Sequence, residues 1–473
     1  MNKNLIFTLV FFSIVFTACR ESFAGDEDYI LSQSIQKTRS IVPNTGNYHV
    51  DVFLVQKYIR FTAPAKTVEE ITPVIRNNSD TLAYIVQYSQ GWDLISGDTR
   101  MSPRLAYSET DTLNLEEYEQ SGVGCITGMV DLVAEMKISS DTTVNPVWKF
   151  LLPKQQQENN EGDIIPYGDV AGMWVPIDTQ YIDNGTTIPH IINTHWYQQS
   201  PYNDICKYYY MGTAGMCNSF AGCGPIALGQ VIYHYLKSSN PFSVPIPINY
   251  NSEGYKIIFS NFSSTQWKNL STANNSLSTY IIYLGQEIMG AEYIPYIDPI
   301  SLKVIREVGV SSDSCAAALD WAHLQYDQTS TYNWQDIVSS LQLSHPIIVT
   351  ACDSSNENGH VFIIDALKIN QSKFIISYLW DDNYTPDFWE LQRNPSWMFE
   401  PCIPNNGGKD DDVYQEEITL EDNYSIAMNW GYGNSADNTY YLIRDGSRTF
   451  VPSWQANSTT YSIIDRLFLN VRQ

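Results

Sequence analysis

A polar, acidic segment punctuated by Pro and Gly divides this 473-residue chain into two parts. The stretch PKQQQENNEGDIIPYGDV occupies residues 153–170. Such a segment is typical of an exposed linker, where proteolysis concentrates. A chain of this length is also too long for one ordinary core. The sequence therefore predicts two folded parts, with cleavage of their connection expected between about 151 and 188.

The first residues predict export. MNKNLIFTLVFFSIVFTAC has Lys3, an apolar run over 5–16 and small residues before Cys19. The run is too short to span a bilayer comfortably, so we expect a signal peptide over 1–18. FTAC resembles a bacterial lipobox, although Phe16 stands where Leu is usual. This resemblance implies a lipidated Cys19, a tether over 19–47, and an exported lipoprotein anchored to the outer membrane or cell surface; a plain cleaved signal is the alternative.

Composition excludes some classes of function. The net charge of −25 argues against nucleic-acid partners, because little basic surface is left to neutralise phosphates. Export makes disulfides possible among the eight cysteines. No Cys-x-x-Cys pair and no Cys/His cluster with zinc-like spacing is present, so we expect no metal and no cofactor. If Cys19 is lipidated and Cys223 is free, six cysteines remain, and the sequence leaves their pairing open.

Hydrophobic patterns predict a mixture of helices and strands in both parts. Residues 81–109 alternate apolar and polar positions between turn signals, which indicates antiparallel strands joined by tight turns. The remaining expectations are helices over 113–120, 129–136, 225–236, 318–327 and 334–344, strands over 346–353 and 360–367, and further strands from 424 onward. We therefore expect an α+β fold.

Cys223 lies between two glycines in AGCGPIALGQVIYHY, residues 221–235. Gly222 and Gly224 allow close backbone approach, and Pro225 suits the first turn of a helix because its missing N–H is not needed there. The thiol would then lie at a helix N-terminus, where the dipole and free N–H groups favour a thiolate. The alternative is a small buried hydrophobe, as most free cysteines are.

His360 is the best candidate among seven histidines for a partner of this thiol. His234 lies eleven residues further along the same helix, about 16 Å away at ~1.5 Å per residue, and cannot reach the thiol. His323 is expected to pack within a helix. His360 begins the apolar strand GHVFIIDAL, 137 residues after Cys223. Papain-like proteases place their histidine roughly 130–150 residues after the cysteine; a structural histidine is the alternative.

Two more segments carry polar groups suited to this chemistry. In AMNWGYG, Asn429 can hold an imidazole by an amide hydrogen bond while Trp430 shields it from water; a plain turn is the alternative. In INTHWYQQSPYND, Gln198 or Gln199 can supply an amide donor for an oxyanion, alongside the N–H of Cys223. Either glutamine can equally be an ordinary surface residue.

Taken together, the segments resemble motifs of the streptopain family of bacterial cysteine proteases, in the branch found in gut Bacteroidetes. The resemblance rests on WYQQSPYN from Trp196, GCGPIALGQ from Gly222, GHVFIIDA from Gly359 and NWGYG from Asn429. It covers about residue 188 to the C-terminus. Upstream, YIVQYSQGWDLISGDTRMSPRLAYSE resembles the propeptide of these proteases.

The resemblance implies a papain-like catalytic domain over 176–473, with a helical side and a sheet side, preceded by an autoinhibitory α+β propeptide over 48–175. The chain would be a zymogen of a cysteine endopeptidase that acts on proteins or peptides, with its own propeptide as inhibitor. Cys223 would be the nucleophile and His360 the base. Gln198 would bind the oxyanion, and Asn429 and Trp430 would support the histidine.

Some positions depart from the family pattern. Tyr197 replaces a glycine, Tyr432 replaces a tryptophan, and an insertion of about 380–423 occupies a place where relatives have a short hairpin. Its KDDD run is expected to be solvated rather than to bind a cation. None of these changes removes a group that the mechanism needs. The alternatives are a catalytically inactive surface binding protein on the same fold, or another Cys–His hydrolase such as a cell-wall amidase or a transglutaminase-like protein.

Overall fold

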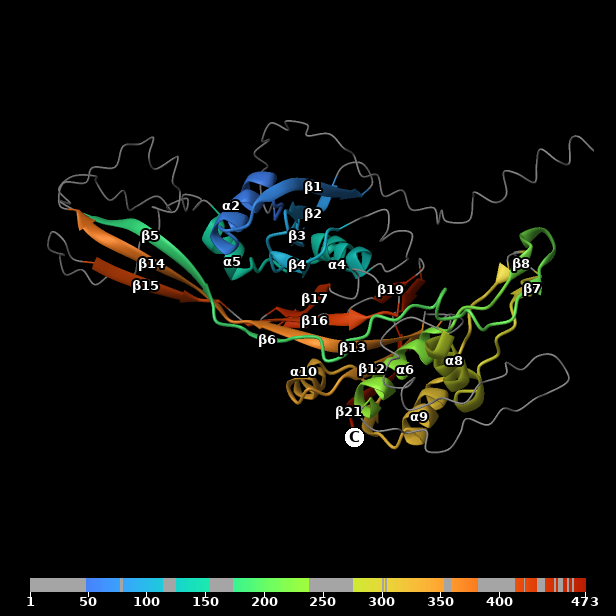
Figure 1. The fold of residues 1–473 in the computed structure, drawn as a ribbon. Coiled ribbons are helices and arrows are strands. Elements are labelled where there is room, and N and C mark those ends of the chain that lie inside the picture. The colour runs from blue at the N-terminus through green and yellow to red at the C-terminus, as the bar shows by residue number, and fades with distance from the viewer. Residues whose placement is uncertain are drawn as a thin grey trace, which may run out of the picture.

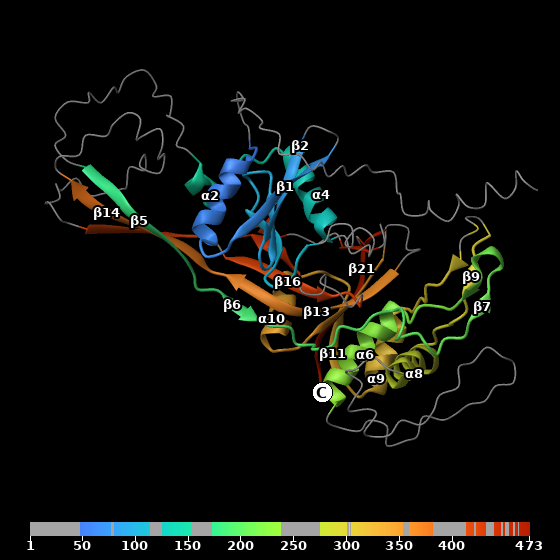
Figure 2. The same ribbon diagram turned by 45° about the horizontal axis from the view of Figure 1, so that its top comes forward.

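The computed structural model describes residues 48–76, 80–113, 125–152, 173–237, 275–299, 302, 304–352, 359–381, 413–420, 422–431, 439–445, 448–449, 454–456, 459–461 and 463–473. These ranges form a mixed helix and sheet structure (Figures 1 and 2). The expected signal peptide, Cys19 and the linker over 153–170 lie outside the described residues. Within the described ranges, we find no helix with the length and apolarity needed to cross a membrane.

Several helices begin at residues whose side chains satisfy their first backbone N–H groups. Asp51, for example, accepts a hydrogen bond from the N–H of Leu54, and Asn333 accepts one from Gln335. The helices are α2 (Val52–Thr62), α4 (Cys125–Ile138), α5 (Pro146–Leu151), α6 (Cys223–Leu236), α8 (Asn275–Tyr283), α9 (Ser312–Trp321) and α10 (Trp334–Gln342), with a 3₁₀ turn η1 (Gly212–Ala214) and a π-helical turn η2 (Leu284–Ile288).

Successive side chains of each strand point to opposite faces of the sheet, and the central strands β12 and β13 are buried on both faces. They are β1 (Val68–Arg76), β2 (Asp80–Tyr88), β3 (Trp92–Ser96), β4 (Arg104–Ser108), β5 (Met173–Asp183), β6 (Thr186–Ile188), β7 (Tyr209–Tyr210), β8 (Met216–Cys217), β9 (Tyr296–Ile297), β10 (Val304–Ile305), β11 (Gln325–Thr329), β12 (Ile347–Cys352), β13 (Gly359–Asn370), β14 (Ser372–Asp381), β15 (Val413–Thr419), β16 (Asn423–Asn429), β17 (Tyr440–Asp445), β18 (Arg448–Thr449), β19 (Trp454–Ala456), β20 (Thr459–Tyr461) and β21 (Ile463–Arg472).

One sheet joins the two parts of the chain. Its strands run in the order β1-β2-β3-β4-β17-β16-β13-β12-β21-β11, so the N-terminal strands continue directly into the C-terminal ones. The junction is the antiparallel pair β4 and β17, with Tyr107 opposite Tyr440. Each of these two strands covers an edge that the other would leave unpaired.

A second sheet extends away from the first as a long arm (left in Figure 1). Its strands are β5, β14 and β15, and β5 pairs with β14 over most of its length. The expected boundary between 175 and 176 falls inside β5. The expected insertion over 380–423 contributes β15 to this sheet, and residues 382–412 of it lie outside the described residues.

Three hydrophobic clusters form the core, and β13 separates two of them. Val361 and Ile363 on one face of β13 pack with α6, α8 and α9, whereas Phe362 and Ile364 on the other face pack with α10 and the N-terminal strands. The third cluster joins α2 and α5 to β14. A residue at the start of β13 is thus fixed between the helical side and the sheet side of the molecule.

Most of the predicted elements are confirmed, including the strands within 81–109, the helices near 129–136, 225–236 and 334–344, and the strands near 346–353 and 360–367. The helix expected over 318–327 is wrong in its second half. Helix α9 ends at Trp321, where His323 has a left-handed backbone (φ 57°), and β11 begins at Gln325. His323 is exposed rather than packed. The helix expected over 113–120 lies almost entirely outside the described residues.

Candidate active site

Cys223 is the first residue of α6, and its two neighbouring glycines are required by the local geometry. Gly222 has φ +89°, a conformation that side chains disfavour. A Cβ on Gly224 would lie 2.2 Å from Cγ2 of Val310. The tight turn and the close approach of the 308–310 segment therefore fix the thiol at the beginning of the helix.

The Cys223 sulfur lies against the backbone of β13. The N–H of Val361 donates a hydrogen bond to Sγ at 3.4 Å. This bond and the N–H groups of Cys223 and Gly224 lower the pKa of the thiol, but burial is the larger effect and raises it above its ordinary value. The side chain of Cys223 is only partly exposed.

His360 immediately precedes Val361 and is almost fully buried, with 4% of its surface exposed. Its ring stacks near Trp430, with centroids 5.9 Å apart, and Nε2 lies 3.2 Å from the carbonyl oxygen of Trp430. A carbonyl only accepts hydrogen bonds, so Nε2 carries the hydrogen and Nδ1 is the basic nitrogen. Burial lowers the pKa of His360 to about 4, so the imidazole is neutral at pH 7.

Asn429 lies in a network of buried polar groups beside the histidine turn. Its side chain exchanges two hydrogen bonds with the amide of Gln230, at 3.2 and 3.1 Å, and donates another to the carbonyl of Thr194 at 2.8 Å. Its Oδ1 also accepts the N–H of Gly431. Asn429 therefore positions the turn that carries Trp430, and the Trp430 backbone carbonyl holds His360.

Gln198 is held beside the nucleophile segment. Its backbone carbonyl accepts the N–H of Ala221, two residues before Cys223, at 2.7 Å. The side chain of Gln198 is partly exposed, and its amide makes no hydrogen bond with any residue that the structure describes. Gln199 is exposed. Of the two glutamines that the sequence offered, Gln198 is therefore the one with a fixed backbone next to Cys223 and an amide available to a bound molecule.

Three buried polar residues that organise this site were not singled out from the sequence. Gln230 accepts the backbone N–H of Trp196, Asn203 donates to the carbonyl of Ser219, and Asp365 accepts the N–H of Ile192. All three stand inside the motifs quoted above. The signal was a polar residue in an apolar run, such as Gln in IALGQVIY or Asp in FIIDAL, because a buried polar group needs a partner.

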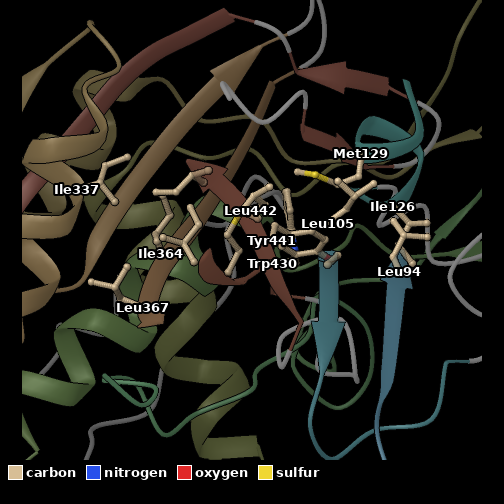
Figure 3. Packing of buried hydrophobic residues seen from close by; sticks show 14 of the residues in the cluster. Leu94, Leu105, Ile126, Met129, Ile337, Ile364, Leu367, Trp430, Tyr441 and Leu442 are labelled. Carbon is tan, nitrogen blue, oxygen red and sulfur yellow. The ribbon is translucent and has the colours of Figure 1, made fainter. Parts of the chain in front are cut away.

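Trp430 joins the candidate site to the N-terminal part of the chain. The indole is fully buried and belongs to one cluster with Leu94, Leu105 and Met129 from β3, β4 and α4 (Figure 3). It also stacks on Phe362, with ring centroids 4.5 Å apart. The N-terminal elements thus pack on the same aromatic group that lies beside His360.

The described residues contain no group of three or more His, Cys, Asp or Glu side chains arranged to hold a metal ion. The KDDD run lies outside them. Cys206, Cys217, Cys223 and Cys315 are free thiols in this structure. The side chains of Cys223, His360 and Gln198 offer the chemistry of a thiol, an imidazole and an amide donor.

No protein-family model matches the chain, and neither does any curated protein. Among solved structures, a fragment of prointerpain A from Prevotella intermedia aligns at 15% sequence identity and a TM-score of 0.42. The alignment covers 86% of this chain and 99% of that chain. This likeness is too low to assign a fold family or an activity.

Proposed function

We propose that this protein is the latent precursor of a cysteine endopeptidase. The observation that carries the proposal is the contact between Cys223 Sγ and the N–H of Val361. It brings a thiol at a helix N-terminus against the strand residue that follows a buried histidine. The resemblance of the four motifs to streptopain-like proteases supports the same function.

The residues at the site supply each step of peptide hydrolysis. Nδ1 of His360 takes the thiol proton, and the Cys223 thiolate adds to the substrate carbonyl carbon. The N–H of Cys223 and the Gln198 amide stabilise the oxyanion. His360 then returns the proton to the leaving amine as the C–N bond breaks, and a water molecule activated by His360 hydrolyses the thioester.

We attribute latency to burial of the thiol and the imidazole. Burial raises the pKa of the Cys223 thiol and lowers the pKa of the His360 imidazole, which disfavours the thiolate–imidazolium pair that attacks a substrate. The N-terminal elements contribute to that burial through the cluster around Trp430. Their removal would hydrate the site, raise the pKa of His360 and lower the pKa of Cys223.

Cleavage that activates the enzyme would fall before Met173. Strands β5 and β6 are hydrogen-bonded to β14 and β13, and paired backbone resists proteases. The polar segment over 153–170 is therefore the site we propose. In this account the precursor is exported and anchored through a lipidated Cys19.

The direct test is replacement of the nucleophile. Cys223→Ala should reduce casein hydrolysis by the activated protein by at least about a thousandfold, since the thiolate forms the covalent intermediate. Cys352→Ala is the matched control, because Cys352 is also a partly exposed cysteine but lies at the end of β12. Full casein hydrolysis by Cys223→Ala would refute the proposal.

A further inference from the structure

Large apolar side chains are exposed mainly on two neighbouring hairpins. One hairpin is formed by β7 and β8 and the other by β9 and β10. Of the twelve large apolar side chains that are exposed in the described residues, seven lie on or beside these hairpins: Tyr208, Tyr210, Met216, Ile294, Tyr296, Ile297 and Leu302. We call the described residues of 208–217 and 294–305 the twin hairpins.

The twin hairpins project together from the helical side of the molecule. Both views show them side by side, beyond α8 (right in Figures 1 and 2). Tyr210 is 75% exposed and Leu302 is 76% exposed. Apolar groups so exposed and so concentrated are typical of a binding surface rather than of an ordinary protein exterior.

The bases of the twin hairpins are fastened to each other next to Cys223. The guanidinium of Arg306, just after β10, donates to the backbone and side-chain oxygens of Asn218, just after β8, at 2.6 and 2.8 Å. The N–H of Phe220 donates to the Arg306 carbonyl at 2.8 Å. From these contacts one segment continues to Gly222 and the other to Val308. The two segments lie close together, because a Cβ added to Gly222 would be 3.3 Å from the side chain of Val308. The hairpin surface is thus connected to the segment that carries the nucleophile.

We propose that the twin hairpins bind an extended, apolar and aromatic-rich segment of a protein substrate, outside the residues that flank the cleaved bond. This inference rests on the proposed function, because the connection to Cys223 is what points to a substrate. Tyr, Met and Ile side chains are enriched in polypeptide interfaces. A two-stranded hairpin also leaves strand edges to which an extended chain can pair.

The charge around the twin hairpins favours a polypeptide over a membrane. Glu292 and Glu307 are exposed beside them, whereas Lys207 is the neighbouring exposed lysine in the described residues. Carboxylates repel the anionic lipid headgroups that attract peripheral proteins. An uncharged, unfolded segment of a protein chain meets no such repulsion.

A binding measurement tests this surface without requiring catalysis. The full chain carrying Cys223→Ala would be titrated against fluorescently labelled β-casein, with and without the double replacement Tyr210→Ser and Leu302→Ser. We expect the Kd to rise about tenfold, as for loss of central apolar contacts. The matched control is Phe53→Ser with Leu343→Ser, because these side chains are 70% and 62% exposed on other elements. The control should bind like the parent.

Equal casein affinity of the hairpin variant and the parent would overturn the inference. So would hairpin-dependent binding to phosphatidylcholine–phosphatidylglycerol vesicles in the absence of casein binding. In the activated enzyme, the hairpin variant should have an about tenfold lower kcat/KM for casein, because its KM for casein rises. It should cleave a short peptide at the same rate as the parent. If the parent cleaves neither substrate, the proposed function fails, while the casein titration still decides the role of the twin hairpins.

Discussion

At the scale of single residues, Gln230 connects the parts of the candidate site. Its amide pairs with Asn429 and accepts the N–H of Trp196, so it links α6, the turn that holds His360 and the segment that leads to Gln198. Gln230→Leu would leave these buried polar groups without their partner. Each unpaired group should lower the free energy of unfolding by about 1–3 kcal/mol. We predict a clearly lower urea midpoint and loss of casein hydrolysis, whereas Gln199→Leu, at an exposed position, should change neither.

His360 gives a prediction for pH. Its pKa of about 4 lies below the ordinary 6.5, so the unfolded chain binds more protons than the folded chain between these values. The contribution of His360 to stability is therefore present at neutral pH and is lost as pH falls through this window, by about 3 kcal/mol in total. Urea unfolding at pH 7 and pH 4.5 should show a larger loss of stability for the parent than for His360→Gln. Equal losses would contradict the buried neutral imidazole.

The sequence predicted the participants of the site better than their contacts. Cys223, His360 and Trp430 could be singled out because a thiol between glycines, a histidine beginning an apolar strand and an Asn–Trp–Gly run are local patterns. The contact between the Trp430 carbonyl and His360, and the pairing of Asn429 with Gln230, depend on how distant strands register. Sequence periodicity carries no information about such register.

At the scale of elements, the beginning of α6 depends on close packing against the 308–310 segment. Gly224→Ala would place a Cβ 2.2 Å from Val310, so the helix start must shift and the thiol must move from Val361. We predict loss of activity and of about 1–3 kcal/mol in stability, as for overpacked cores. Gly309→Ala, where an added Cβ meets nothing within 4 Å, should leave both unchanged. A fully active Gly224→Ala enzyme would contradict this geometry.

Local sequence patterns explain why some elements were predictable. Strands β12 and β13 are buried apolar runs bounded by turn signals, and α10 has clear helical periodicity, so each pattern stands out locally. The end of α9 was missed because ALDWAHLQYD stays compatible with a helix beyond Trp321. Tertiary pairing of Gln325–Thr329 with β21 decides the outcome instead.

At the scale of the whole molecule, the N-terminal part is attached to the rest by sheet pairing, by shared hydrophobic clusters and by a few buried polar contacts. Asn145, which caps α5, donates to both carboxylate oxygens of the buried Asp445 on β17, at 3.3 and 3.0 Å. Asn145→Ala removes this donor and should weaken the attachment by about 1–3 kcal/mol. We predict alkylation of Cys223 by iodoacetamide at pH 8 to become several-fold faster, as judged by mass spectrometry. An unchanged rate, equal to that of the control Glu69→Ala at an exposed position of β1, would show that this contact does not restrain the site.

The continuity of the main sheet is the feature that the sequence did not reveal. A polar linker indicates two parts, and that division remains compatible with the chain. It does not indicate that β4 will pair with β17, because edge-to-edge pairing between distant segments leaves no local pattern. Through this shared sheet and core, the N-terminal part is joined to the aromatic cluster that contains Trp430.

The central claim is that Cys223 is the nucleophile of a peptidase held latent by the N-terminal part of its own chain. The most direct measurement is labelling of the full chain with a peptidyl epoxide, before and after limited proteolysis within 153–172, with the adduct located by mass spectrometry. Our account predicts little labelling of the intact chain, and after cleavage an adduct on Cys223 together with loss of casein hydrolysis. A folded, cleaved protein without an adduct on Cys223, or an intact chain labelled equally fast, would contradict it.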